Sequence, residues 1–192
     1  MNFKQLATLI VLPSAIFFLS STTALAGSES GLYIGGSFGN ASVSKEGDPN
    51  TDPDFKFDES DSGYKLFMGY NFGIIPLIDV AVEGSYVDFG KPSGTTSDGT
   101  NIEYDLTAWD AYGLVGLTFG PFALFGKAGL VAWNSDDAYG ALSGSETGTD
   151  ATYGLGVKFQ IASFAIRAEY EYFDLDSFDD VYMASIGVAY TF

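Results

Sequence analysis

The sequence has no cysteine and no histidine among its 192 residues. Without cysteine there is no disulfide, no thiolate metal site and no cysteine nucleophile. Without histidine there is no Ser-His or Cys-His catalytic pair, and most zinc sites lose their usual ligands. These two absences predict that the protein is not an enzyme and that it needs no metal or other cofactor.

Positive charge is also scarce. Eight Lys and Arg residues stand against 25 Asp and Glu residues, which gives a formal net charge of −17. A chain this acidic repels the phosphates of DNA and RNA, whose binding depends on Lys and Arg contacts. We therefore expect no nucleic-acid partner.

The one long apolar run lies at the start of the chain. Lys4 is followed by the mostly apolar segment Leu6–Leu19 and then by the small-residue segment Ala24–Ala26. A positive start, a short apolar core and an A-x-A site are typical of a secretory signal peptide. An uncleaved membrane anchor is the alternative, but a spanning helix needs about 20 apolar residues. We predict a signal peptide over 1–26 and a single mature domain over 27–192.

The rest of the chain alternates apolar and polar residues with the period of a β-strand, and no later segment has 18 consecutive apolar residues. This pattern predicts eight strands: Leu32–Ser44, Gly63–Phe72, Leu77–Phe89, Asp105–Phe119, Phe122–Asn134, Thr149–Ile161, Phe164–Asp174 and Val181–Phe192.

The connections between these strands alternate between short and long. The short ones are Gly73–Pro76, Gly120-Pro121 and Ala162-Ser163, and the longer ones are Lys45–Ser62, Gly90–Tyr104, Ser135–Gly148 and Leu175–Asp180. An up-and-down barrel with one trimmed rim and one elaborated rim produces this order. The sequence therefore predicts an all-β fold, an eight-stranded antiparallel up-and-down barrel.

The apolar set faces outward if the barrel crosses a membrane and inward if the barrel is soluble, as in lipocalins. The polar set is rich in Gly and small residues, which suits a narrow lumen. Aromatic residues gather at both ends of the apolar set: Phe72, Phe119, Phe159, Phe164, Tyr190 and Phe192 at one end, and Tyr64, Tyr86, Trp109, Tyr153, Tyr172 and Tyr182 at the other. Trp109 and Phe119 lie ten steps apart, or roughly 25 Å along a tilted strand. This favours a transmembrane barrel.

The inward set contains charged residues of both signs: Lys65, Asp79, Glu83, Asp110, Lys127, Lys158, Arg167, Glu169 and Glu171. An eight-stranded barrel has room inside for side chains and little more, and buried charges need partners. We predict an ion-pair network in the lumen, with Glu83 and Arg167 as favoured partners. The network either fills the lumen and fixes the strand register, or acts as a gate that exchanges partners. A Ser-Lys catalytic pair is the weaker interpretation of these lysines.

Several segments resemble the OmpA-like transmembrane β-barrels of Gram-negative outer membranes. The segments are 31–39 (GLYIGGSFG), 61–72 (DSGYKLFMGYNF), 81–90 (AVEGSYVDFG), 125–130 (FGKAGL) and 167–173 (RAEYEYF). The resemblance implies an integral outer-membrane protein with short periplasmic turns, long extracellular loops and interior salt bridges. It does not extend to the peptidoglycan-binding domain that full-length OmpA proteins carry, so we expect no cell-wall anchoring.

The C-terminal segment resembles the assembly signal of outer-membrane barrels. Its characteristic residues are Ser185, Gly187, Tyr190 and the final Phe192. The resemblance implies that the barrel-assembly machinery recognises this strand, with assembly chaperones as further partners.

The long connections are acidic and poor in apolar residues, so we expect them to order weakly. Asp48, Asp52 and Asp54 are close enough to suggest calcium ligands, but the Gly and distal Glu of an EF-hand loop are missing. We therefore predict no specific metal site; loose divalent bridging to lipopolysaccharide remains an alternative. The expected partners are outer-membrane lipids, lipopolysaccharide, and a host or phage ligand at the loops. The predicted function is a structural and surface-interaction role, and the alternative is a narrow gated pore for ions or small solutes.

Overall fold

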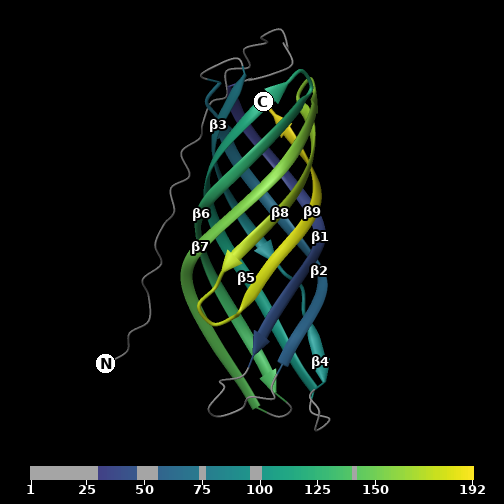
Figure 1. The fold of residues 1–192 in the computed structure, drawn as a ribbon, viewed down its shortest axis with the longest axis vertical. Helices are drawn as coiled ribbons and strands as arrows, with labels where there is room; N and C mark the ends of the chain where they lie inside the picture. Colours follow the sequence, from purple (N-terminus) through teal and green to yellow (C-terminus); the bar gives the residue numbers. More distant parts are fainter. Residues whose placement is uncertain (1–29, 47–55, 74–76, 96–100, 140–141) are drawn as a thin grey trace, which may run out of the picture.

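A computed structural model describes residues 30–46, 56–73, 77–95, 101–139 and 142–192. The chain forms a closed barrel of tilted strands (Figure 1). The strands are β1 (Gly31–Glu46), β2 (Lys56–Asn71), β3 (Ile78–Asp88), β4 (Ser93–Thr95), β5 (Asn101–Phe119), β6 (Phe122–Tyr139), β7 (Leu142–Ile161), β8 (Phe164–Asp174) and β9 (Asp180–Thr191). No helix in these ranges is long and apolar enough to cross a membrane.

The eight long strands pair with their neighbours along the chain, always antiparallel, and the pairs β1–β9 and β3–β5 complete the ring. The prediction of an eight-stranded antiparallel up-and-down barrel is therefore confirmed. The three-residue strand β4 was not predicted. It lies inside the expected loop Gly90–Tyr104 and pairs with the first residues of β5, beyond the end of β3.

Two tight turns connect neighbouring strands at one end of the barrel. Gly120-Pro121 joins β5 to β6, and Ala162-Ser163 joins β7 to β8. Gly120 has a φ of 61° and Ala162 a φ of 50°, which is the left-handed region. The C-terminal end of β9 lies at this same short-turn end (Figure 1).

At the opposite end the strands run further than predicted. Most of the expected loop Ser135–Gly148 is a β-hairpin, because β6 and β7 stay in register up to the pair Tyr139 and Leu142. In the expected loop Lys45–Ser62, the first two residues and Lys56–Ser62 also belong to strands. The prediction that these segments are loops throughout is wrong. Their outward side chains are polar because they face water, while the inward alternation of the strands continues.

The outer surface is apolar over the part nearer the short turns. Exposed side chains there include Leu66, Met68, Val82, Val115 and Leu124. Aromatic rings contact one another at both edges of this band, as in the pairs Phe164 with Tyr190 and Tyr86 with Trp109. The predicted signal peptide and Asp48, Asp52 and Asp54 lie outside the described residues.

Candidate functional site in the barrel lumen

Strand β3 shows how the lumen is layered. Its inward side chains, in order from the short-turn end, are Asp79, Ala81, Glu83, Ser85 and Val87, with Phe89 following the strand. Along this strand the lumen thus begins with an acidic residue at its mouth, followed by a small apolar layer, a charged layer and a larger apolar layer. The other strands contribute to the same layers because their inward residues also recur with period two.

The centre of the charged layer is a pair between β8 and β3. Arg167 donates to Glu83 through Nη1, 2.6 Å from Oε2, and through Nη2, 3.3 Å from Oε1. The Nε atom of Arg167 lies 2.8 Å from Oε1 of Glu169. Strands β3 and β8 are not neighbours, so the pair spans the lumen.

Two lysines complete the layer. Lys65 donates to Glu169 at 2.8 Å and to Glu171 at 2.6 Å. Lys127 donates to the same two carboxylates at 2.7 and 2.6 Å and lies 3.7 Å from Glu83. We call Lys65, Glu83, Lys127, Arg167, Glu169 and Glu171 the central network. Its side chains are at most 4% exposed, and its three cations balance its three carboxylates.

Aromatic side chains that the sequence analysis did not single out surround the central network. Tyr33 donates to Glu83 at 2.9 Å, and Tyr112 donates to Glu171 at 3.3 Å. The Arg167 guanidinium lies 4.4 Å from the ring centre of Phe67 and 5.0 Å from that of Phe125. All four aromatic residues share the inward parity of the charged residues, and this was the signal available in the sequence.

Asp79 and Lys158 form a separate pair at the short-turn mouth. Lys158 donates to Asp79 at 2.9 Å, and both side chains are partly exposed. A cavity of about 60 Å³ lies at this end of the lumen, with these two residues, Tyr33 and Arg167 among its lining. The central network is thus reached from the short-turn side through a small, partly polar space.

Asp110 lies in the lumen, and no Lys or Arg in the described part of the chain pairs with it. Its Oδ1 accepts a hydrogen bond from the Ser85 hydroxyl, while its Oδ2 has no hydrogen-bond partner. The residue is 6% exposed. No Lys or Arg nitrogen of the described residues lies within 4.0 Å of it, so it stands apart from the central network.

Beyond Asp110, fourteen buried residues fill the lumen on the long-loop side. We call this set the apolar layer: Ala41, Val43, Val87, Phe89, Tyr104, Leu106, Ala108, Val131, Trp133, Phe173, Leu175, Phe178, Val181 and Met183. The rings of Phe89 and Phe173 meet edge to face at 4.8 Å. Leu175 and Phe178 belong to the turn between β8 and β9, which therefore folds back into the mouth of the barrel.

Asp150 ties this turn to the barrel wall. Its Oδ2 accepts from the indole Nε1 of Trp133 at 2.6 Å and from the backbone N–H of Asp176 at 3.4 Å. The indole lies against Gly148 on the neighbouring strand, where an added Cβ would come within 2.7 Å of the ring. The close approach of ring and backbone explains why glycine occupies this position.

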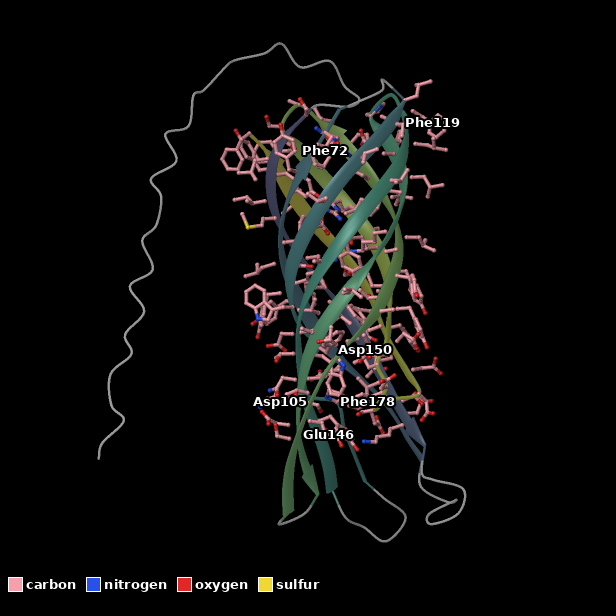
Figure 2. All side chains as sticks on the ribbon, turned by 90° about the vertical axis from the view of Figure 1, so that its left-hand side faces the viewer. Phe72, Asp105, Phe119, Glu146, Asp150 and Phe178 are labelled. Atoms are coloured by element: carbon pink, nitrogen blue, oxygen red, sulfur yellow. The ribbon has the colours of Figure 1, made fainter. Side chains whose placement is uncertain are left out.

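The end of the barrel beyond the outer aromatic edge is acidic. Its described carboxylates are Asp58, Glu59, Asp61, Asp88, Asp105, Asp136, Glu146, Asp174, Asp176, Asp179 and Asp180. Asp150 also lies at this end but points inward to Trp133. Figure 2 shows Asp105, Glu146 and Asp150 toward this end, far from Phe72 and Phe119 at the other. Among the cations here, Lys91 pairs with Asp105 at 2.9 Å, and Lys45 lies over the Tyr104 and Phe178 rings.

The residues of the predicted assembly signal all lie on β9 or just after it. Ser185 is buried in the lumen, and Gly187 follows it at the next inward position. Tyr190 and Phe192 face outward at the short-turn end, with their ring centres 5.1 Å apart. Within the described ranges, no three acidic side chains are placed to hold a metal ion.

The family follows from a comparison with known sequence families. The model of the outer membrane protein beta-barrel domain matches residues 11–192, which is nearly the whole chain. The chain belongs to this family. As a member, it is an integral protein of the Gram-negative outer membrane. No curated protein sequence matches it.

Solved outer-membrane barrels share the fold at low identity. The attachment invasion locus protein Ail of Yersinia pestis, in complex with the heparin analogue sucrose octasulfate, is 21% identical, with a TM-score of 0.58 over 85% of this chain and 99% of that one. Neisserial surface protein A is 18% identical, with a TM-score of 0.61 over 85% and 98%. The N-terminal barrel of Pseudomonas aeruginosa OprF is 19% identical, with a TM-score of 0.53 over 85% and 100%.

Proposed function

We propose that this outer-membrane barrel has a structural and surface-interaction role, with a closed lumen and an acidic outer end that binds cationic partners. The observation that carries the proposal is the succession of the central network and the apolar layer along one narrow lumen. A surface or structural role is the coarse function that the family and its solved members indicate.

The two layers oppose conduction for different reasons. The central network is electrically balanced and buried, so a passing ion would have to displace an existing partner. The apolar layer consists mainly of hydrocarbon side chains, which give an ion little in exchange for its hydration shell, and the desolvation of an ion costs many kcal/mol. Together they support a plugged barrel that contributes to membrane integrity.

The outer end supports binding of a basic partner. Exposed carboxylates such as Asp136, Glu146 and Asp176 dominate its surface, and opposite charge steers and selects partners there. The sulfated ligand in the Ail structure is anionic and does not suit this surface. A basic region of a host or phage protein is the partner class that the charge favours, with adhesion or recognition as the outcome.

A narrow gated pore is the second candidate function. It is favoured by Lys127, which has three carboxylates within 3.7 Å and could exchange one for another. The cavity at the short-turn mouth also brings solvent close to Arg167. In this case ions or small solutes would pass when the network rearranges.

Planar-bilayer conductance of the refolded mature chain tests the closed lumen. Heat-modifiable migration on a gel first confirms that the barrel is folded. Silence, or rare events of very small conductance, supports the plugged barrel. Steady channels that change on substitution of Arg167 or Glu83 would replace it with the gated pore.

Binding of an oligolysine peptide to the barrel in detergent tests the acidic surface. We expect an affinity that falls steeply as salt rises. It should also fall in a variant with Asp136→Asn and Glu146→Gln. Asp79→Asn is the control: Asp79 lies at the short-turn mouth of the lumen, so this variant should bind the peptide as the parent does. An affinity indifferent to salt and to the surface changes would contradict the proposal.

We further propose that residues 1–26 are removed on export, which the mass of the mature protein would test. The barrel-assembly machinery reads Ser185, Gly187, Tyr190 and Phe192. The protein catalyses no reaction, which is supported by the lack of histidine and by the engagement of Lys65 and Lys127 in ion pairs.

A further inference from the structure

A groove interrupts the outer aromatic edge of the barrel. The rings of Tyr64, Tyr86 and Trp109 contact one another along β2, β3 and β5, with ring centres 6.3 and 5.2 Å apart. The strand register continues this row to Ala132 on β6 and Thr149 on β7. These two small side chains leave a groove of about 520 Å³ beside Trp109, which is 67% exposed.

The groove is lined by uncharged polar groups. Thr107, Asn134 and Thr147 form the next row outward and face the same side as Trp109 and Thr149. These residues offer hydroxyl and amide groups next to an aromatic face. No Lys or Arg belongs to the lining. The chemistry suits a neutral group with several hydroxyls, which can donate and accept hydrogen bonds and rest its C–H face on the indole.

Charge outside the groove argues against a phosphate as the ligand. Asp105 and Asp136 stand opposite each other in the row just beyond Thr107 and Asn134. The ammonium of Lys91 is 2.9 Å from Asp105 and so is already engaged. A phosphate at the groove would meet carboxylates rather than free cations.

A second groove on the same face is apolar and lies at the depth of the lipid chains. It has a volume of about 420 Å³, and its outward lining is Met68, Tyr70, Val82, Gly84 and Ala111. Ala111 of the apolar groove lies two residues from Trp109 of the polar groove, at the next outward position of β5, so the two grooves lie one after the other along the same face. The apolar groove is continuous with the apolar band that contacts lipid. One molecule with a polar head and an apolar tail would therefore occupy both grooves.

We propose that this face of β2, β3, β5, β6 and β7 binds a glycolipid of the outer leaflet, with a sugar of its headgroup in the polar groove and an acyl chain in the apolar one. The height of the groove supports this occupant. Trp109 marks the outer edge of the apolar band, where aromatic residues sit at the level of lipid headgroups. The site does not depend on whether the lumen conducts or on the partner of the acidic end.

The test uses the folded barrel with both tryptophans, because Trp109 is 67% exposed and Trp133 only 4%, so acrylamide quenches mainly Trp109. The barrel is reconstituted in phosphatidylcholine vesicles with or without rough lipopolysaccharide. We expect lipopolysaccharide to reduce acrylamide quenching of Trp109 at least twofold. Lipopolysaccharide should also remain bound to the barrel after a detergent wash, as detected by native mass spectrometry. Both the reduced quenching and the retention should persist in EDTA.

Ala132→Phe fills the groove and should abolish both effects. Ala184→Phe is the matched control, because Ala184 is an exposed alanine on β9 at the other side of the ring. Heat-modifiable migration shows that each variant is folded. Equal retention by Ala132→Phe and Ala184→Phe would overturn the proposal. So would equal protection of Trp109 in the two vesicle types, or retention lost in EDTA, which would indicate cation-bridged phosphate instead of a sugar contact.

Discussion

Arg167 and Glu83 meet across the lumen through two hydrogen bonds, although 84 positions separate them in the sequence. One residue comes from β8 and the other from β3, and neither strand pairs with the other. The contact therefore fixes the distance across the barrel as well as the charge balance within it.

Removing one member of this pair should destabilise the barrel strongly. Arg167→Met leaves Glu83 buried without its main partner, which typically costs about 3–5 kcal/mol. The double variant Arg167→Met, Glu83→Met should recover much of that loss, because no unpaired charge remains at this point. Urea unfolding of the four proteins in a double-mutant cycle measures the coupling. Strictly additive losses would contradict a direct partnership.

Asp110→Asn should leave the barrel as stable as the parent or more stable, by about 1 kcal/mol. The change removes a buried carboxylate that has no cationic partner among the described residues, and it keeps an oxygen for the Ser85 hydroxyl. Glu171→Gln is the matched comparison, since it withdraws charge from both Lys65 and Lys127. It should destabilise. Equal urea midpoints for the two variants would contradict the difference we expect between the unpaired Asp110 and the ion-paired Glu171.

Phe173→Ala should create a cavity in the apolar layer and lower the free energy of unfolding by about 3–5 kcal/mol. If the apolar layer is the seal, the variant should also show conductance events in planar bilayers that the parent lacks. Phe164→Ala is the control, because Phe164 lies on the same strand but faces outward at the short-turn end. A silent Phe173→Ala barrel of parental stability would contradict both roles.

Ala162→Asn should stabilise the barrel by roughly 1 kcal/mol. Ala162 has a left-handed backbone with a φ of 50°, which asparagine adopts more readily than alanine. The same change at Ser163, whose φ is not positive, serves as the control. The urea midpoint is the measurement, and a larger gain at Ser163 would rule out this explanation.

Phe192→Ala should reduce the amount of folded barrel in the outer membrane of cells without slowing refolding in detergent. This outcome is expected if the assembly machinery reads the last aromatic residue. Phe164→Ala removes another outward ring, also in contact with Tyr190, and should assemble normally. The folded fraction is read from heat-modifiable migration. A parallel loss of refolding in detergent would indicate a structural role instead.

Local alternation was enough to predict the strands inside the membrane. The seventh predicted strand, Phe164–Asp174, has the bounds of β8, because its inward charges alternate with outward apolar residues. Beyond Trp109 the outward residues of β5 to β7 turn polar, and polar segments look like loops. The outward residues become polar because this part of each strand faces water instead of lipid, while the strand itself continues.

Contacts across the lumen were harder to predict. Parity shows that Asp110 and Glu83 face inward, but the meeting of two inward residues depends on strand tilt and register around the ring. Lys65 can reach two carboxylates on β8, whereas Asp110 is matched with Ser85 on β3. These relations come from the closed barrel as a whole and have no local sequence signal.

The apolar layer gives the end of the barrel beyond the membrane a core of its own. Strand ends there are held from within by side chains such as Phe89 and Phe173, so they do not rely on the connections between them. Substitutions of Leu175 or Phe178 in the turn between β8 and β9 should destabilise the barrel, because both residues belong to the apolar layer. Insertions or substitutions in the other connections at this end should leave the free energy of unfolding almost unchanged. Those connections are thus the part of the sequence most free to diverge, while the barrel that carries them stays the same.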